Sequence, residues 1–175
     1  MRMGPASRTF SWRSGSDRSS QCATIGSSMA ERRVAPAGYS ARTLPEKLGF
    51  KSGDRAAILY SPEGYLATLG ELPTQVKLLS GRARQLDFIQ MFARSRTDLE
   101  RTFAKAAARL KPDGMLWISW PKQSSPLAGD LNENIVRELG LALGLVDVKV
   151  AAIDYDWSGL KFVYRLKNRP TRSGS

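Results

Sequence analysis

An indole ring, a proline and an amine follow one another at the end of the most apolar run of the chain. That run, 115–120, ends in Trp120, and Pro121 and Lys122 come next. A lysine at the edge of a crevice can bind an acidic ligand, or act as a base where removal of water lowers its pKa. A solvated strand end explains the same lysine, so both interpretations stay open.

A carboxylate and a tyrosine follow the first apolar run, 55–61. Glu63 lies in the turn 61–64, where a helix is expected to begin. A carboxylate there stabilises the helix by about 0.3–1 kcal/mol through the helix dipole. The alternative is a ligand contact or a base beside Tyr65. The side chains expected to line one crevice are Ser61, Glu63, Tyr65, Arg94, Trp120, Lys122 and Ser124.

Trp157 lies next to Ser158-Gly159, at an expected turn. Packing is the favoured role, because an exposed indole leaves a large apolar area in water. The alternative is a surface aromatic that contacts a ligand or a partner.

Several kinds of chemistry lack the side chains they need. Histidine is absent and Cys22 is the only cysteine, so Cys/His zinc sites, disulfides and Ser-His-Asp triads are excluded. Asp154 and Asp156 flank a turn and are expected to stabilise it. We therefore predict no metal site.

The net charge of +11 sits mainly at the two ends of the chain. Residues 1–33 carry six arginines and two acids, and residues 165–175 carry four basic residues and no acid. Basic tails hold polyanions loosely and in a salt-sensitive way, but such tails are commonly only solvated. Nucleic-acid binding through the tails is therefore the third and weakest functional hypothesis.

The composition predicts one folded domain between two tails. Residues 1–36, rich in Ser and Arg, are expected to be disordered, with Met29 as the favoured true start; 37–168 form one α/β domain, and 169–175 a second disordered basic tail. The first 28 residues hold no apolar run of the length of a signal peptide or a membrane span. We expect a cytoplasmic protein with no membrane partner.

Apolar runs alternate with helical patterns along the domain. Strands are expected at 55–61, 75–79, 86–93, 115–120, 146–153 and 160–166. Helices are expected at 44–48 with a capping box of Thr43 and Glu46, after the cap Ser61, at 95–110 with an apolar stripe that includes Leu99, Phe103 and Ala106, and after the cap Asp130. The alternation predicts a three-layer, Rossmann-like, mainly parallel sheet, and the last two strands predict an antiparallel hairpin. In such sheets ligands bind beyond the carboxyl ends of the central strands, where Trp120 to Lys122 are expected.

The order of elements around the turn Lys111-Pro112-Asp113-Gly114 resembles a shortened class I methyltransferase fold. More closely, residues 38–168 resemble the bacterial family called domain of unknown function 3052. The resemblance rests on GYSARTLPEKLGFKSGDR, PEGY, LKPDGMLWISWPK and GLVDVKVAAIDYDWSGLKFVYRLKNR. The resemblance implies a bacterial, cytoplasmic origin, and the family offers no established activity or catalytic residues to carry over to this chain.

S-adenosylmethionine sites need a glycine-rich turn after the first strand and an acidic residue after the second. Pro62 removes a backbone donor from the first turn, and 78–81 offers no carboxylate. We therefore predict no cofactor, and expect a non-catalytic domain that binds a small molecule or regulates a protein partner. The alternative is a small enzyme, such as a divergent S-adenosylmethionine-dependent methyltransferase, with Glu63 or Lys122 as its acid-base group.

Overall fold

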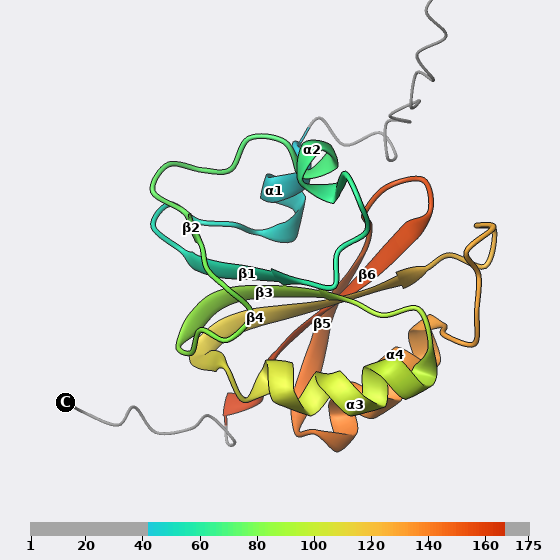
Figure 1. Cartoon of the computed structure of the whole chain (residues 1–175). Helices are drawn as coiled ribbons and strands as arrows, with labels where there is room; N and C mark the ends of the chain where they lie inside the picture. Colours follow the sequence, from blue (N-terminus) through green and yellow to red (C-terminus); the bar gives the residue numbers. More distant parts are fainter. Residues whose placement is uncertain (1–41, 167–175) are drawn as a thin grey trace, which may run out of the picture. The chain divides into compact units, whose positions relative to one another are not determined.

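The described residues form one mixed sheet with helices on both faces, as the computed structural model in Figure 1 shows. The structure describes residues 42–166. Their elements are α1 (Leu44–Leu48), β1 (Arg55–Leu59), α2 (Tyr65–Leu69), β2 (Lys77–Leu78), β3 (Leu86–Phe92), α3 (Arg96–Ala107), β4 (Leu110–Pro121), α4 (Glu133–Ala142), β5 (Leu145–Ala152) and β6 (Trp157–Tyr164). Both expected tails lie outside the described residues.

The sheet has the order β2-β1-β3-β4-β6-β5. The first four strands are parallel, whereas β6 runs antiparallel to both β4 and β5. The predicted mainly parallel sheet with a closing antiparallel hairpin is confirmed. The chain moves from β1 outward to β2, and then crosses to β3 on the other side of β1. The strand order therefore reverses between β1 and β3, which is the place where open α/β sheets bind ligands.

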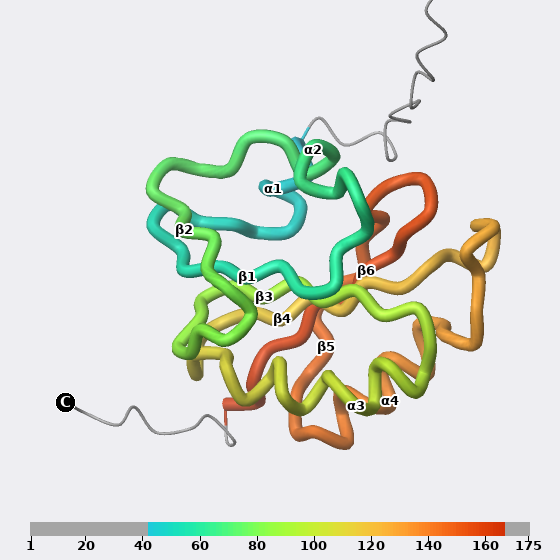
Figure 2. The backbone as a smooth tube through the Cα atoms, viewed as in Figure 1, coloured from blue at the N-terminus to red at the C-terminus, as the bar shows by residue number. Residues whose placement is uncertain are grey.

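Each face of the sheet has its own apolar core. Figures 1 and 2 show α1 and α2 over one face and α3 and α4 over the other. The stripe predicted for α3 is confirmed, since Leu99, Phe103 and Ala106 are buried against the sheet. On the α1 face, the Nε1 of Trp117 donates a hydrogen bond of 2.8 Å to the carbonyl of Leu48 and so fixes α1.

The first two helices begin differently. The predicted capping box of α1 is confirmed, because the Thr43 amide donates to the Glu46 carboxylate at 2.9 Å. The prediction that Ser61 caps α2 is wrong. The Tyr65 amide donates to the carbonyl of Pro62, which closes a turn, and α2 starts only after Gly64, whose φ is 75°. A glycine adopts this left-handed conformation without steric cost.

The cap of α4 was also predicted at the wrong residue. Asn132, not Asp130, caps the helix, and its side-chain oxygen accepts from the Ile135 amide at 3.0 Å. Asp130 instead accepts from the Arg96 amide at 3.0 Å, in the first turn of α3. The tertiary fold gives this carboxylate a partner on another helix, which sequence spacing does not reveal. Between residues 42 and 166, no helix is both long and apolar enough to span a membrane.

Candidate functional site

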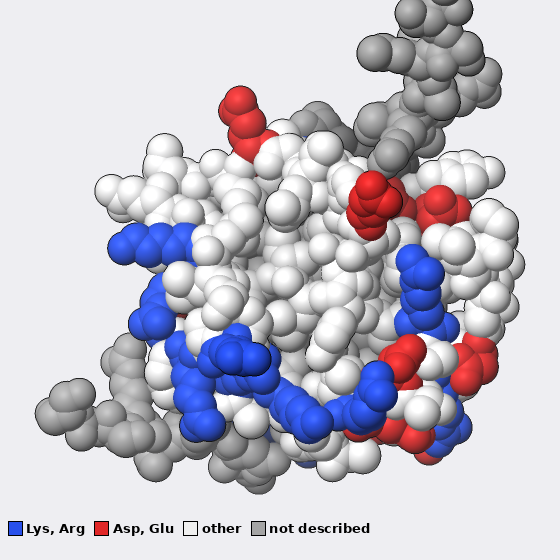
Figure 3. Space-filling model, in the orientation of Figure 1, with Lys and Arg blue, Asp and Glu red and all other residues white. Residues whose placement is uncertain are grey.

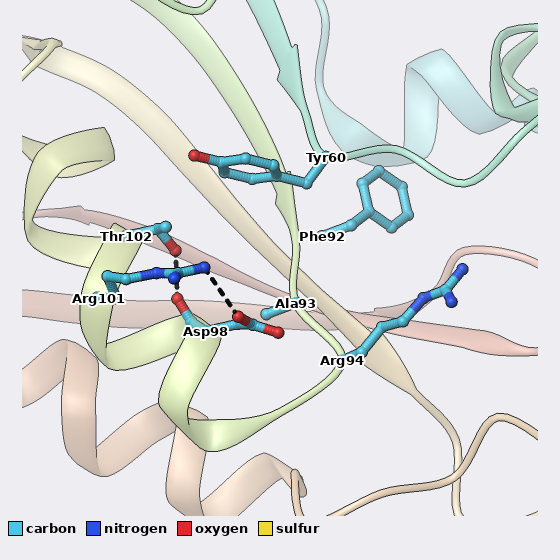
Figure 4. A pocket seen from close by; sticks show the side chains of 7 residues that line it. All are labelled: Tyr60, Phe92, Ala93, Arg94, Asp98, Arg101 and Thr102. Carbon is cyan, nitrogen blue, oxygen red and sulfur yellow. Dashed lines mark hydrogen bonds and ion pairs between the residues drawn. The ribbon is translucent and has the colours of Figure 1, made fainter.

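A hollow lies at the carboxyl ends of β1 and β3, where the strand order reverses (Figure 4). Its volume is about 250 Å³. The side chains that line it come from the end of β1, the end of β3 and the first half of α3: Tyr60, Phe92, Ala93, Arg94, Asp98, Arg101 and Thr102. We call this hollow the β1–β3 slot.

The β1–β3 slot has an aromatic wall and a polar wall. Figure 4 shows Tyr60 on one side, Arg101 and Thr102 from α3 on the other, and Ala93 between the two sides. Because the side chain of Ala93 is small, the space between the two walls stays open. A flat ring that enters this space meets the face of a tyrosine and a guanidinium group, and both stack on planar ligands.

Tyr60 is held in an unusual conformation at the mouth of the slot. Its φ is 55°, and 69% of its surface is exposed. A bulky residue in the left-handed region costs on the order of 1–3 kcal/mol, and such residues cluster at functional sites. The surrounding fold therefore holds Tyr60 in a strained backbone conformation, with its ring beside the slot.

Each oxygen of the carboxylate in the slot accepts a hydrogen bond. Asp98 accepts from Arg101 Nη2 at 3.1 Å and from Ser95 Oγ at 2.9 Å. Its backbone carbonyl accepts from Thr102 Oγ1 at 2.6 Å. Arg94 differs, because it forms no salt bridge with any carboxylate of residues 42–166. Arg94 is thus an exposed cation at the edge of the slot, on the side of Phe92 in Figure 4.

The structure brings Arg94 alone of the seven predicted crevice residues into the slot. Tyr65 is only 2% exposed, and its hydroxyl donates to Gln90 Oε1 at 2.7 Å. Gln90 Nε2 donates in turn to Ser119 Oγ at 3.1 Å. Burial raises the pKa of the Tyr65 hydroxyl, so this tyrosine stays protonated inside the core.

The indole and the amine at the end of β4 form a structural junction. Trp120 is 5% exposed and belongs to the core beneath α3. Lys122 Nζ donates to the Asp154 carbonyl at 2.7 Å, and its amide donates to the Asp156 carbonyl at 2.7 Å. The end of β4 is thereby tied to the β5–β6 turn.

Trp157 lies on the buried side of the same junction. It is 3% exposed and makes an edge contact with Phe92, with ring centroids 5.0 Å apart. The favoured packing role is confirmed, and the surface alternative is wrong. Ser61, Glu63 and Ser124 are exposed, and a ligand role for them and for Lys122 stays a prediction.

Tyr60 and the polar residues of α3 were missed from the sequence. One signal was available: Asp98, Arg101 and Thr102 have the helical spacing i, i+3, i+4 and lie beside the apolar stripe. A helix that follows a strand at the carboxyl edge presents its first turns there. No pattern in the sequence predicts that Tyr60 adopts a positive φ.

A conventional S-adenosylmethionine site does not fit the residues present. The turn after β1 holds Tyr60 and Pro62, where close approach of the backbone to a ligand requires glycine and a free amide. The residues after β2, Leu79 and Ser80, offer no carboxylate to ribose hydroxyls. Among residues 42–166 there is also no group of three acidic or cysteine side chains arranged to bind a metal.

Comparison with solved structures shows the methyltransferase fold. An Aquifex aeolicus S-adenosylmethionine-dependent methyltransferase matches with 16% identity and a TM-score of 0.51, over 67% of this chain and 85% of that one. A ribosomal protein L11 methylase from Lactobacillus delbrueckii subsp. bulgaricus matches with 12% identity and a TM-score of 0.51, over 70% and 75%. Mitomycin 7-O-methyltransferase matches with 10% identity and a TM-score of 0.53, over 70% and 53%. The chain therefore has a class I methyltransferase-like fold.

Two further comparisons found nothing. No family model matches the chain, and no curated protein matches it. Membership of domain of unknown function 3052, and the bacterial origin that it implies, stay predictions. At 10–16% identity the solved structures bear on the fold and not on the activity.

Proposed function

We propose that the chain is a small-molecule-binding domain whose ligand places a flat ring in the β1–β3 slot. The observation that carries the proposal is the strained, exposed Tyr60 facing Arg101 across a hollow at the reversal of strand order. Arg94 supplies a cation for an acidic group of the same ligand. A ring between a phenol and a guanidinium gains stacking and cation–π contacts together.

The size of the slot limits the ligand. Pockets for drug-sized molecules have volumes of roughly 300–1,000 Å³, whereas this one has about 250 Å³. One planar ring system fills such a space, and the rest of a larger ligand would lie along the open carboxyl edge. A nucleobase-like heterocycle has the matching shape.

Binding is favoured over catalysis because the slot has no free acid-base group. Asp98 is held by Ser95 and Arg101. Tyr65, which could serve as a base, is buried away from the slot and bonded to Gln90. A general base must reach the proton it removes, so neither side chain meets that need in this arrangement.

The second candidate is a divergent S-adenosylmethionine-dependent methyltransferase. The fold supports this candidate, because the chain has a fold similar to that of solved methyltransferases. In that case the slot would hold the adenine ring of the cofactor, and Arg94 would lie beside the rest of it. Binding of the cofactor would then need a group other than a carboxylate after β2 to form hydrogen bonds with the ribose hydroxyls.

Ligand titration of the full chain tests the proposal. Adenosine, S-adenosylmethionine and S-adenosylhomocysteine would each be titrated in a thermal unfolding assay, and native mass spectrometry of freshly purified protein would detect a copurified ligand. A ligand at 100 times its dissociation constant stabilises a protein by about 2.7 kcal/mol. We expect this stabilisation to be lost in Tyr60→Ala and kept in Tyr155→Ala.

The two tyrosines make a matched pair, because each has 69% of its surface exposed and Tyr155 lies in the β5–β6 turn. Equal stabilisation of both variants, or none by these compounds and no copurified ligand, would contradict the proposal. Formation of S-adenosylhomocysteine from S-adenosylmethionine, dependent on Tyr60, would establish the second candidate instead.

Two further predictions belong with this proposal. We propose that residues 37–168 form one α/β domain, in line with the single mixed sheet of residues 42–166. We also propose a cytoplasmic location, as the resemblance to domain of unknown function 3052 implies.

A further inference from the structure

Basic side chains gather along α3 and the connection between β2 and β3. Figure 3, in the orientation of Figure 1, shows Lys and Arg as a nearly continuous run over this part of the molecule. On α3 and just beyond it, Arg101, Lys105 and Arg109 recur at a spacing of four residues, which places them along one side of the helix.

The β2–β3 connection extends this run. Arg109 Nη1 lies 3.8 Å from the position of a Cβ added at Gly81, and the Leu86 amide donates to the Arg109 carbonyl at 3.0 Å. The connection 79–85, which carries two exposed arginines, therefore lies beside the end of α3. We call the following set the basic band: Arg82, Arg84, Arg101, Lys105 and Arg109.

The basic band is short of carboxylate partners. Arg101 pairs with Asp98 at 3.1 Å, but the other four members form no salt bridge within the described part of the chain. Elsewhere among residues 42–166, Arg96, Lys111 and Arg137 form salt bridges, whereas other basic side chains such as Arg94 do not. The charge of the band is thus left for an external anion.

The dimensions of the band favour a polymeric anion. Eight residues separate Arg101 from Arg109, or about 12 Å along a helix. One strand of a duplex places a phosphate about every 3.4 Å of axis, so three or four phosphates span this length. A single small anion would contact only one or two of these cations.

We propose that the basic band binds the phosphate backbone of duplex nucleic acid. Single-strand binders alternate cations with aromatic side chains that stack on bases, and the band contains no aromatic residue. A surface of exposed Lys and Arg contacts phosphates without reading sequence. The band lies within residues 82–109, and Arg101 is its one member that also lines the β1–β3 slot.

Salt dependence of binding to duplex DNA and duplex RNA tests the proposal on the full chain. The variant is Arg82→Gln/Lys105→Gln, which leaves the slot residue Arg101 intact. The matched control is Lys51→Gln/Lys149→Gln, which removes two exposed lysines near α1, where Lys149 Nζ donates to the Lys47 carbonyl. Each variant lowers the net charge by two and leaves both tails unchanged.

We expect wild type and control to bind alike by fluorescence anisotropy. The band variant is expected to bind on the order of tenfold more weakly, and the slope of log affinity against log salt to fall by about 1.8, for two lost phosphate contacts. Preference between the DNA and RNA duplexes then identifies the source of the backbone.

Three results would overturn the proposal. One is the absence of duplex binding by wild type at low salt. The second is an equal loss in both variants, which would assign the effect to net charge and the tails. The third is binding to vesicles with anionic lipid at matched charge but not to either duplex.

Discussion

The buried hydrogen bond between Tyr65 and Gln90 offers a direct measure of what holds the core around β3. The substitution Tyr65→Phe removes one hydroxyl and keeps the edge contact with Phe92, whose ring centroid lies 4.6 Å away. Gln90 Oε1 then lacks its donor in a position with no exposed surface. A buried polar group without a partner costs about 1–3 kcal/mol, so we expect that loss in the free energy of unfolding.

Urea denaturation followed by circular dichroism measures this loss, and thermal unfolding gives an independent check. For a folded region of this length, the same change lowers the melting temperature by roughly 3–15 °C. Tyr155→Phe is the matched control, because Tyr155 lies exposed in a turn, and its expected effect is within about 0.5 kcal/mol. If the two variants lose equal stability, the buried bond does not contribute as proposed.

The same tyrosine predicts an alkaline dependence of stability. Burial raises the pKa of Tyr65, while its hydrogen bond to Gln90 lowers it less. In the unfolded chain the hydroxyl ionises near its ordinary pKa of about 10. The folded form keeps the proton, so its stabilising effect is complete below about pH 10 and is lost as the pH rises further. The stability difference between wild type and Tyr65→Phe should therefore shrink above about pH 10; a constant difference would contradict the burial of this hydroxyl.

Two further substitutions test local packing. Asn132→Ala should cost about 1 kcal/mol, because the amide of Ile135 loses its cap, whereas Asn132→Asp should keep most of the stability in urea denaturation. Gly140→Ala should cost about 1–3 kcal/mol, since its Cβ would lie 2.2 Å from Phe162 Cε1 in the core. The double variant Gly140→Ala/Phe162→Leu should lose less than the sum of the two single losses; additive losses would refute the steric explanation.

Local patterns predicted the elements well where the chain decides its own structure. The helix at 44–48 carries its cap, its first-turn proline and its terminal glycine within seven residues, so its limits are the observed ones. The stripe of α3 and the alternation of β6 likewise predicted which faces are buried, whereas the alternation of β5 did not, since its Val148 and Val150 are exposed. The periodicity of apolar residues is a property of the local sequence, so it can be recognised without knowledge of tertiary contacts.

Elements that depend on distant partners were predicted less well. β4 begins at Leu110 rather than at 115, because Leu110 pairs with Leu86 ahead of a register shift in β3. Asp130 was predicted to cap α4, but in the structure its carboxylate accepts a hydrogen bond from the Arg96 amide. Such choices depend on which segments meet in space, and sequence spacing does not fix that.

By itself, the sequence determined the fold class, the order of elements and the edge of the sheet where ligands are expected. Only the tertiary structure decided which side chains at that edge remain available. Trp120 is buried in the core and Lys122 Nζ donates a hydrogen bond to the Asp154 carbonyl, whereas Tyr60 and Arg94 lie beside a hollow. The physical reason is competition: a polar or aromatic group first satisfies the partners that folding places within reach, and a site forms from the groups that remain.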